Sequence, residues 1–280
     1  MAADAPADPF AIAAETVRTH DPDRYLADLF LPEEKRRHVL ALHAFNAEVA
    51  RVRDAVSEPA LGEIRLQWWR DALAGDDGGH PIARALRQTI DAFNVPIDAL
   101  ERLIDARAFD LYDDPMPTLN DLEGYAGETS SSLIQMAAII LAGERDPGTA
   151  AAAGHAGVAT AIAGLLRALP VHARRGQQYL PQHLMVKHGA DAAAMFEGRT
   201  TAGLKDVLAD LRARARHHLA AAWQGLAGAP SDVKAAFLPL ALVEPYLRRL
   251  ERRGYDPLAA QVALPPWQRP WVLWRAARSL

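Results

Sequence analysis

Residues 164–184 read GLLRALPVHARRGQQYLPQHL, and this stretch carries the most specific pattern in the chain. A basic pair, Arg174-Arg175, is followed by Gly176 and then by Tyr179-Leu180-Pro181. The pair comes a few residues after a helix that we expect from Ala150 to Ala168, because apolar side chains recur there at helical spacing.

The longest apolar run of the chain leads into this stretch, from about Thr149 to Leu166. It is mostly Ala and Gly, includes His155, and is followed by Arg167 and Pro170. A membrane-spanning helix needs ~20 strongly apolar residues. We therefore expect no transmembrane segment here, but a helix whose small side chains let neighbouring helices approach closely.

The whole chain has the periodicity of an all-α protein, because apolar residues recur at helical spacing and strict alternation is hard to find. About nine or ten helices around one core are expected, in a single domain over residues 1–280. We expect its core at about 20–255 and a Trp-rich tail at about 256–280. Besides a helix that begins at Asp21-Pro22, expected helices include Pro32 to about Val56, Pro81 to Phe93, Pro96 to Tyr112, Leu119 to Leu141, Ala202 to Leu226, and Ser231 to Arg253.

Composition excludes several classes of function. The formal charge of -4 and a pI near 6.2 give no basic surplus for nucleic acid, so no nucleic-acid partner is expected. The absence of cysteine removes disulfides, thiolate nucleophiles and iron-sulfur clusters. The opening residues MAADAPADPF resemble neither a secretory signal nor a transit peptide. We expect a cytoplasmic protein.

Four segments, which together span most of the chain, carry a further pattern. They are FLPEEKRRHVLALHAFNAEVARVRD (residues 30–54), GEIRLQWWRDAL with GHPIARAL (62–73 and 79–86), MPTLNDLEGYAGETSSSLIQMAA (116–138), and the stretch at 164–184. In this order they resemble the squalene/phytoene synthase family. The resemblance implies an isoprenoid-synthase-type helical bundle around a central cavity.

The same resemblance shows that the family's two aspartate-rich motifs are degenerate in this chain. The acidic positions of the first motif fall at Ala50, Arg51 and Asp54, so one carboxylate remains. The second motif falls at Gly164, Arg167, Ala168 and His172, where both acids are gone.

These losses bear on the metal that the family's reaction needs. Carboxylates four residues apart share a helix face, and magnesium takes such oxygen ligands while it offsets the charge of a departing diphosphate. Ala50 and Ala168 cannot ligate a metal, Arg51 would repel it, and His172 suits so hard an ion poorly. We expect no metal site, no catalytic residue and no cofactor; magnesium belongs only to the alternative of an active enzyme.

Other candidate groups favour structural roles. Asp110 and Asp114 have the spacing of a carboxylate pair, but Pro115 predicts that Asp113-Asp114 ends a helix in a solvated turn. The histidines lack the three- or four-residue spacing of a transition-metal site. Ser130-Ser131-Ser132 lacks a nucleophile elbow and is expected to pack or to line a cavity.

Cationic side chains could still retain an anion, such as an isoprenoid diphosphate or a lipid phosphate, because the family's matching positions surround the diphosphate. The alternatives are an exposed basic pair at Arg174-Arg175 and a surface row of ion pairs at Glu48-Arg51-Asp54. The candidate ligand-binding residues are Arg51, Arg167, His172, Arg174, Arg175 and Tyr179.

The tryptophans of the tail, Trp267, Trp271 and Trp274, fall at i, i+4 and i+7. We expect them to pack on the core; an interfacial anchor or a partner-docking face is the alternative. Trp68-Trp69 has the same two interpretations, and packing is expected.

Residues 45–58, followed by the stretch from Arg65 to Trp69, are similar to the branch of the family that includes the mitochondrial complex I assembly factor 6. The similarity implies a pseudoenzyme in the biogenesis of NADH:ubiquinone oxidoreductase, with complex I subunits or assembly intermediates as partners. Its place would be cytoplasmic and peripheral to the inner membrane. Two alternatives stay open: an active prenyltransferase that condenses two prenyl diphosphates, and an isoprenoid or lipid carrier.

Overall fold

The computed structural model describes residues 8–143 and 145–280, and the regular structure in these ranges is helical throughout. The all-α prediction is confirmed. The prediction that the chain lacks a leader concerns its opening residues, of which 1–7 lie outside the described ranges.

The α-helices are α1 (Pro9–His20), α2 (Pro22–Asp28), α3 (Glu33–Ala50), α4 (Pro59–Ala74), α5 (Pro81–Phe93), α6 (Ile97–Arg107), α7 (Leu119–Ala126), α8 (Ser132–Ala142), α9 (Ala150–Arg174), α10 (Gln182–Lys187), α11 (Ala192–Phe196), α12 (Ala202–Gly225), α13 (Ser231–Lys234), α14 (Val243–Leu250) and α15 (Gln268–Ala277). The 3₁₀ turns η1 (Arg53–Ala55), η2 (Ala108–Leu111) and η4 (Ala235–Leu242) and the π-helical turn η3 (Gly127–Ser131) complete the set. The most extensive helix packing joins helices that are not adjacent in the sequence, α9 with α12 and α1 with α3.

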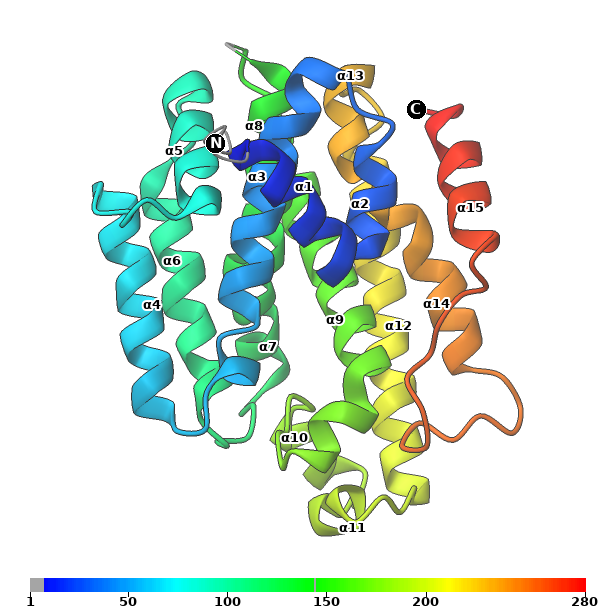
Figure 1. Ribbon diagram of the computed structural model, residues 1–280. Helices are drawn as coiled ribbons and strands as arrows, with labels where there is room; N and C mark the ends of the chain where they lie inside the picture. The colour runs from blue at the N-terminus through cyan, green and yellow to red at the C-terminus, as the bar shows by residue number, and fades with distance from the viewer. Residues whose placement is uncertain (1–7, 144) are drawn as a thin grey trace.

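The helices α3, α8 and α9 occupy the middle of the bundle (Figure 1). In the same view α4, α5 and α6 form one side and α14 and α15 the other. The two longest helices, α9 and α12, pack against each other, and α15 packs on η4 and α2. The C-terminal helix therefore lies at the edge of the fold.

Several helices differ from the sequence prediction: the one expected from Pro96 to Tyr112 is α6 followed by η2, and the one expected from Ser231 to Arg253 is divided into α13, η4 and α14. The helix that begins near Pro32 stops at Ala50 rather than Val56, because the chain turns at Arg51 and continues into η1. The helix expected to end at Ala168 runs through Pro170 to Arg174. Proline inside a helix removes a hydrogen bond, but Leu169 and Ala173 on either side are buried, and this packing stabilises the continuation.

The helix α1 was not predicted, although a capping signal announces it. Asp8 accepts a hydrogen bond from the backbone N–H of Phe10, and Pro9 occupies the first turn. Phe10, Ala13 and Val17 are buried at helical spacing, and α1 packs on α3 and α5. At the other end Leu273 is fully buried, so the core extends beyond the expected range of about 20–255.

The small side chains of α9 allow the close packing that the sequence predicted. A Cβ atom built on Gly157 would lie 2.2 Å from the backbone nitrogen of Ser131, so only glycine fits where α9 crosses η3. By length and composition α9 could also cross a membrane, but 56% of its apolar window is buried inside the fold. Such burial is typical of a core helix.

We predict that Gly157→Ala destabilises the protein by about 1–3 kcal/mol, because the new methyl group forces α9 away from η3. Urea unfolding of the purified protein measures the change. Gly154, three residues earlier on the same helix, has open space at its Cβ position. Gly154→Ala should therefore be neutral or stabilising by up to about 1 kcal/mol. Equal effects of the two substitutions would contradict the packing argument.

Candidate functional site

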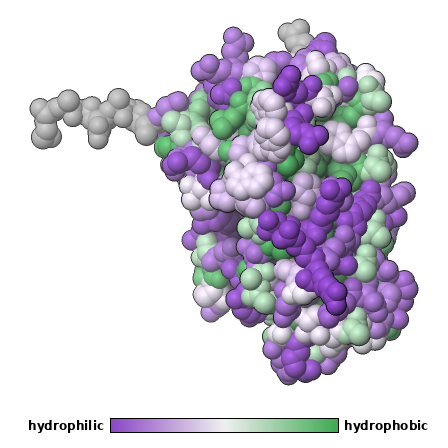
Figure 2. Space-filling view, turned by 90° about the vertical axis from the view of Figure 1, so that its right-hand side faces the viewer, coloured by the Kyte–Doolittle hydropathy of each residue, from purple (hydrophilic) through white to green (hydrophobic). Residues whose placement is uncertain are grey.

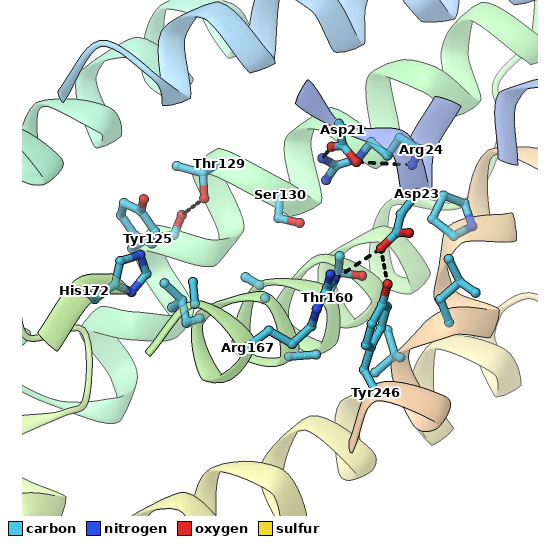
Figure 3. A pocket seen from close by; sticks show the side chains of 18 of the residues that line it. Asp21, Asp23, Arg24, Tyr125, Thr129, Ser130, Thr160, Arg167, His172 and Tyr246 are labelled. Carbon is cyan, nitrogen blue, oxygen red and sulfur yellow. Dashed lines mark hydrogen bonds and ion pairs between the residues drawn. The ribbon is translucent and has the colours of Figure 1, made fainter. Parts of the chain in front are cut away.

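A pocket of about 330 Å³ opens between α2, η3, α9, η4 and α14. Figure 3 shows the polar side chains that project into it from α2, α9 and α14. Small residues of α9 form much of its wall, among them Ala161, Ala163, Gly164 and Ala168. Its charged and polar lining residues are Asp21, Asp23, Arg24, Arg107, Tyr125, Thr129, Ser130, Thr160, Arg167, His172 and Tyr246.

Asp23 in the first turn of α2 is the most connected carboxylate of the pocket. It accepts hydrogen bonds from the Tyr246 hydroxyl at 2.6 Å and from the guanidinium groups of Arg167 and Arg269, each at 3.2 Å (Figure 3 draws the first two). The Arg167 guanidinium also stacks 3.5 Å from the centre of the Tyr246 ring. Four separate segments, α2, α9, α14 and α15, thus meet at one side chain.

The other arginines of the pocket are paired as well. Arg24 binds Asp21, which also caps the N-terminus of α2. Arg107 donates to Asp110 at 3.1 Å. Each of the three arginines that line the pocket therefore faces a carboxylate, and an anionic ligand would have to compete with these carboxylates for them.

Asp110 lies at the centre of a buried hydrogen-bond network. Besides the bond from Arg107, its carboxylate accepts from the hydroxyls of Tyr125 at 2.8 Å and Tyr179 at 2.7 Å. Burial, together with the nearby carboxylate, raises the pKa of both tyrosines, so they stay protonated as donors. The helical segment ends at Leu111, before Asp113 and Asp114, and both of these side chains are exposed as expected.

His172 lines the pocket with its ring 4.6 Å from that of Tyr179. Burial lowers the pKa of the imidazole to about 4, while the negative charge of Asp110 opposes the shift. At neutral pH the side chain is therefore uncharged and cannot attract an anion electrostatically.

The π-helical turn η3 supplies two of the hydroxyl groups that line the pocket, those of Thr129 and Ser130. Thr129 donates to the backbone carbonyl of Tyr125 at 2.7 Å, whereas the Ser130 hydroxyl lines the pocket and is buried without a hydrogen-bond partner. Ser131 donates to the carbonyl of Gly154 at 2.9 Å. The serines thus divide between lining the cavity and packing.

The two degenerate motifs lie in different surroundings. Gly164 and Ala168 line the pocket, but Ala50, Arg51 and Asp54 do not. Asp54, the carboxylate left in the first motif, forms an ion pair with Arg175, 121 residues away in sequence. A direct ion pair therefore links the two motif regions.

The six candidate ligand-binding residues do not converge on one site. Arg167 and His172 line the pocket, and Tyr179 lies behind His172. Arg174 is exposed and donates to the carbonyl of Pro170 at 2.7 Å. Arg51 lies outside the pocket, after the end of α3. Its guanidinium is 3.8 Å from the Glu48 carboxylate, and both residues line a separate groove with Arg65, Trp68 and His80.

The donor atoms do not suit magnesium. The motif positions that face the pocket carry no carboxylate, and Asp21 and Asp23 already bind arginines. Over residues 8–143 and 145–280 no group of three or more potential metal ligands is close enough to hold an ion. His155 and His218 do meet, with their Nδ1 atoms 2.9 Å apart, but as a hydrogen-bonded pair.

Sequence reasoning missed the residues that organise this pocket. Asp21 and Asp23 were interpreted only as helix-start signals, and Tyr246 carried no signal at all. Arg107 and Asp110 have the three-residue spacing of a helical ion pair, which could have suggested their contact. Nothing local indicates the long-range bonds from Tyr125 and Tyr179.

Comparison with known proteins gives the relatives of the chain. The family model described as "Squalene/phytoene synthase" matches residues 17–275. The chain is 35% identical to "NADH dehydrogenase (ubiquinone) complex I, assembly factor 6" of Rattus norvegicus, over 86% of this chain and 74% of that protein. It is 32% identical to the Homo sapiens protein of the same name over the same shares, and 27% identical to a phytoene synthase of Thermus thermophilus over 93% of this chain and 89% of that protein.

Solved structures share the fold at lower identity. A dehydrosqualene synthase in complex with a ligand superposes with a TM-score of 0.80 at 20% identity, covering 97% of this chain and 95% of the other. A squalene synthase of Alicyclobacillus acidocaldarius gives 0.77 at 22% identity, covering 89% and 95%. The expected isoprenoid-synthase-type architecture is confirmed.

We predict that Asp110→Asn lowers the free energy of unfolding by about 3–5 kcal/mol, because it leaves the Arg107 guanidinium buried without its counter-charge. Urea unfolding measures the loss. The matched control is Asp113→Asn, at an exposed side chain three residues away, which should change stability by less than about 0.5 kcal/mol. A loss at Asp110 no larger than that at Asp113 would refute the network.

We also predict a pH-dependent difference between the wild type and His172→Phe. The folded imidazole titrates at about 4 and the unfolded one near 6.5, so the unfolded chain binds the proton first as pH falls. The stability from burying the neutral ring is full above pH ~6.5 and is lost progressively toward pH ~4, by about 3 kcal/mol. Urea unfolding from pH 7.5 to 4.5 should show the wild type losing more stability than the variant. Parallel pH profiles of the free energy of unfolding for the two proteins would contradict the prediction. The difference between them at pH 7.5, where the imidazole is neutral in both states, is the internal control.

Proposed function

Because this chain belongs to the squalene/phytoene synthase family, we propose that it is a non-catalytic member that acts in the biogenesis of respiratory complex I. Relatives named complex I assembly factor 6, or homologues of it, come from rat, mouse, human, cattle and fruit fly at 31–35% identity. They align over 85–86% of this chain, which supports a shared role.

The observation that carries the non-catalytic part is the state of the first motif. Its surviving carboxylate, Asp54, is bound by Arg175, and its other two positions hold Ala50 and Arg51. Departure of a diphosphate needs electrophilic help, which magnesium held by carboxylates supplies. Among the residues that the structure describes, the motif positions that line the pocket offer no carboxylate for such a clamp.

The role proposed here is the recruitment or maturation of complex I subunits or assembly intermediates, peripheral to the inner membrane. A ligand in the pocket is not required for it. Retention of an isoprenoid or lipid phosphate by Arg167 and Arg24 is a second proposal, favoured by their position in the pocket. The phosphate would displace the carboxylates of Asp23 and Asp21 from these two arginines.

We predict that pure protein incubated with farnesyl or geranylgeranyl diphosphate and magnesium releases no inorganic diphosphate, while a phytoene synthase assayed in parallel does. Measurable release would restore the prenyltransferase alternative. Magnesium-independent binding, with the diphosphate recovered intact, would favour the carrier alternative. Arg167→Gln should weaken such binding.

Deletion in the native organism should selectively lower the NADH:quinone activity of membranes and spare succinate:quinone activity. The wild-type chain and Asp54→Asn should both restore it, because the half-exposed pair with Arg175 is worth only about 0–1 kcal/mol. If Asp54 instead held a metal for catalysis, Asp54→Asn would fail to complement while folding normally. Unchanged NADH:quinone activity in the deletion would refute the assembly role.

A further inference from the structure

The C-terminal helix α15 turns its aromatic side chains away from the core. Leu273 is fully buried, whereas Trp267, Trp271 and Trp274 are 70%, 52% and 41% exposed. The prediction that these tryptophans pack on the core is therefore wrong, because Leu273 on the opposite face takes that position. The three indoles form what we call the tryptophan stripe.

The tryptophan stripe is followed along the same face of the helix by a cationic side chain, Arg278. Arg278 follows Trp274 at i+4, is exposed, and holds its guanidinium 5.0 Å from the Trp274 ring. Trp271 and Trp274 stack on each other with ring centres 5.2 Å apart and planes at 25°. Stacking keeps both rings on the outer face of the helix.

The charge of this segment contrasts with that of the whole chain. Residues 257–280 contain three arginines and no acidic residue, while the full chain has a net charge of -4. Arg269 is bound to Asp23, which fixes α15 to α2, and Arg275 and Arg278 are exposed. The outer face of α15 thus presents indoles and cations together.

Further apolar side chains lie on the side of the molecule that α15 covers. The helix α2, against which α15 packs, leads into Leu29 and Phe30, which are 44% and 40% exposed. Figure 2 faces the side that carries α14 and α15 and shows apolar and pale side chains among charged ones in its upper half, above a band of strongly hydrophilic ones.

We propose that the tryptophan stripe docks the protein on an anionic lipid bilayer. Indole rings prefer the head-group region, where the ring is apolar and its N–H stays hydrated. Arg275 and Arg278 would contact lipid phosphates. The inference rests on the membrane location proposed above and assigns it to α15.

The charge and the position of the stripe favour lipid over a protein partner. Tryptophan and arginine also anchor protein interfaces, but there the charges are matched by a partner of opposite sign. Here the anchors are tryptophans, the charges have one sign, and α15 lies at the edge of the fold, where a flat surface can reach it (Figure 1). These are the properties of interfacial helices.

Co-sedimentation of the purified chain with vesicles tests the proposal. The protein should bind vesicles that contain phosphatidylglycerol and should bind phosphatidylcholine vesicles only weakly. Salt should reduce the binding to the phosphatidylglycerol vesicles. Trp267→Ser with Trp271→Ser should lower the partition coefficient about tenfold or more. Arg275→Gln with Arg278→Gln should lower it about fivefold per arginine. Ile64→Ser and Val186→Ser, at side chains 65% and 70% exposed on other helices, are the matched controls and should have no effect.

Tryptophan fluorescence gives an independent reading of the same contact. Emission should shift to the blue on phosphatidylglycerol vesicles and be quenched by brominated lipid, and the shift should vanish in the double tryptophan variant. Absence of binding to any vesicle, or equal loss in the controls at Ile64 and Val186, would overturn the proposal and leave the stripe to a protein partner. Vesicle binding is measured without complex I, so the two proposals can fail separately. The protein could fail to bind vesicles and still complement the deletion, or bind vesicles and fail to complement it.

Discussion

The carboxylate of Asp23 is the interaction on which the arrangement of this protein depends. It accepts hydrogen bonds from Tyr246 on α14, Arg167 on α9 and Arg269 on α15. One side chain therefore joins the beginning of the chain to its centre and its end. Removing this partly buried carboxylate would leave two guanidinium groups without a counter-charge and would lower the free energy of unfolding by several kcal/mol. The pocket mouth and the position of α15 both follow from it.

Ion pairing inside the molecule also determines what the pocket can do. A buried charge is tolerated only when it is paired, and here Arg24, Arg107 and Arg167 each have a carboxylate partner. The charges that a diphosphate-processing site would direct at its substrate are neutralised within the protein. This pairing is consistent with the assembly role proposed above, in which the fold binds other proteins rather than transforming a substrate.

The exposed tryptophans are compatible with this stable interior because two contacts on the opposite face hold α15. Leu273 is fully buried, and Arg269 reaches Asp23. The helix is thus fixed without using its indoles. The indoles are exposed among the described residues, and the position of α15 at the edge of the bundle makes this surface accessible to another molecule.

The sequence by itself determined the helical class, most helix positions and the need for small residues on α9, because these depend on local periodicity and on side-chain identity. The degeneracy of the metal motifs followed from the resemblance to a known family. Sequence reasoning could not find the pairing of Asp54 with Arg175 or the donors around Asp110, and it misplaced the tryptophans of α15. Only the tertiary structure decided these, because they join residues distant in the chain. Helical spacing defines a face of α15 but not whether the core or the solvent receives it; that depends on how neighbouring helices pack.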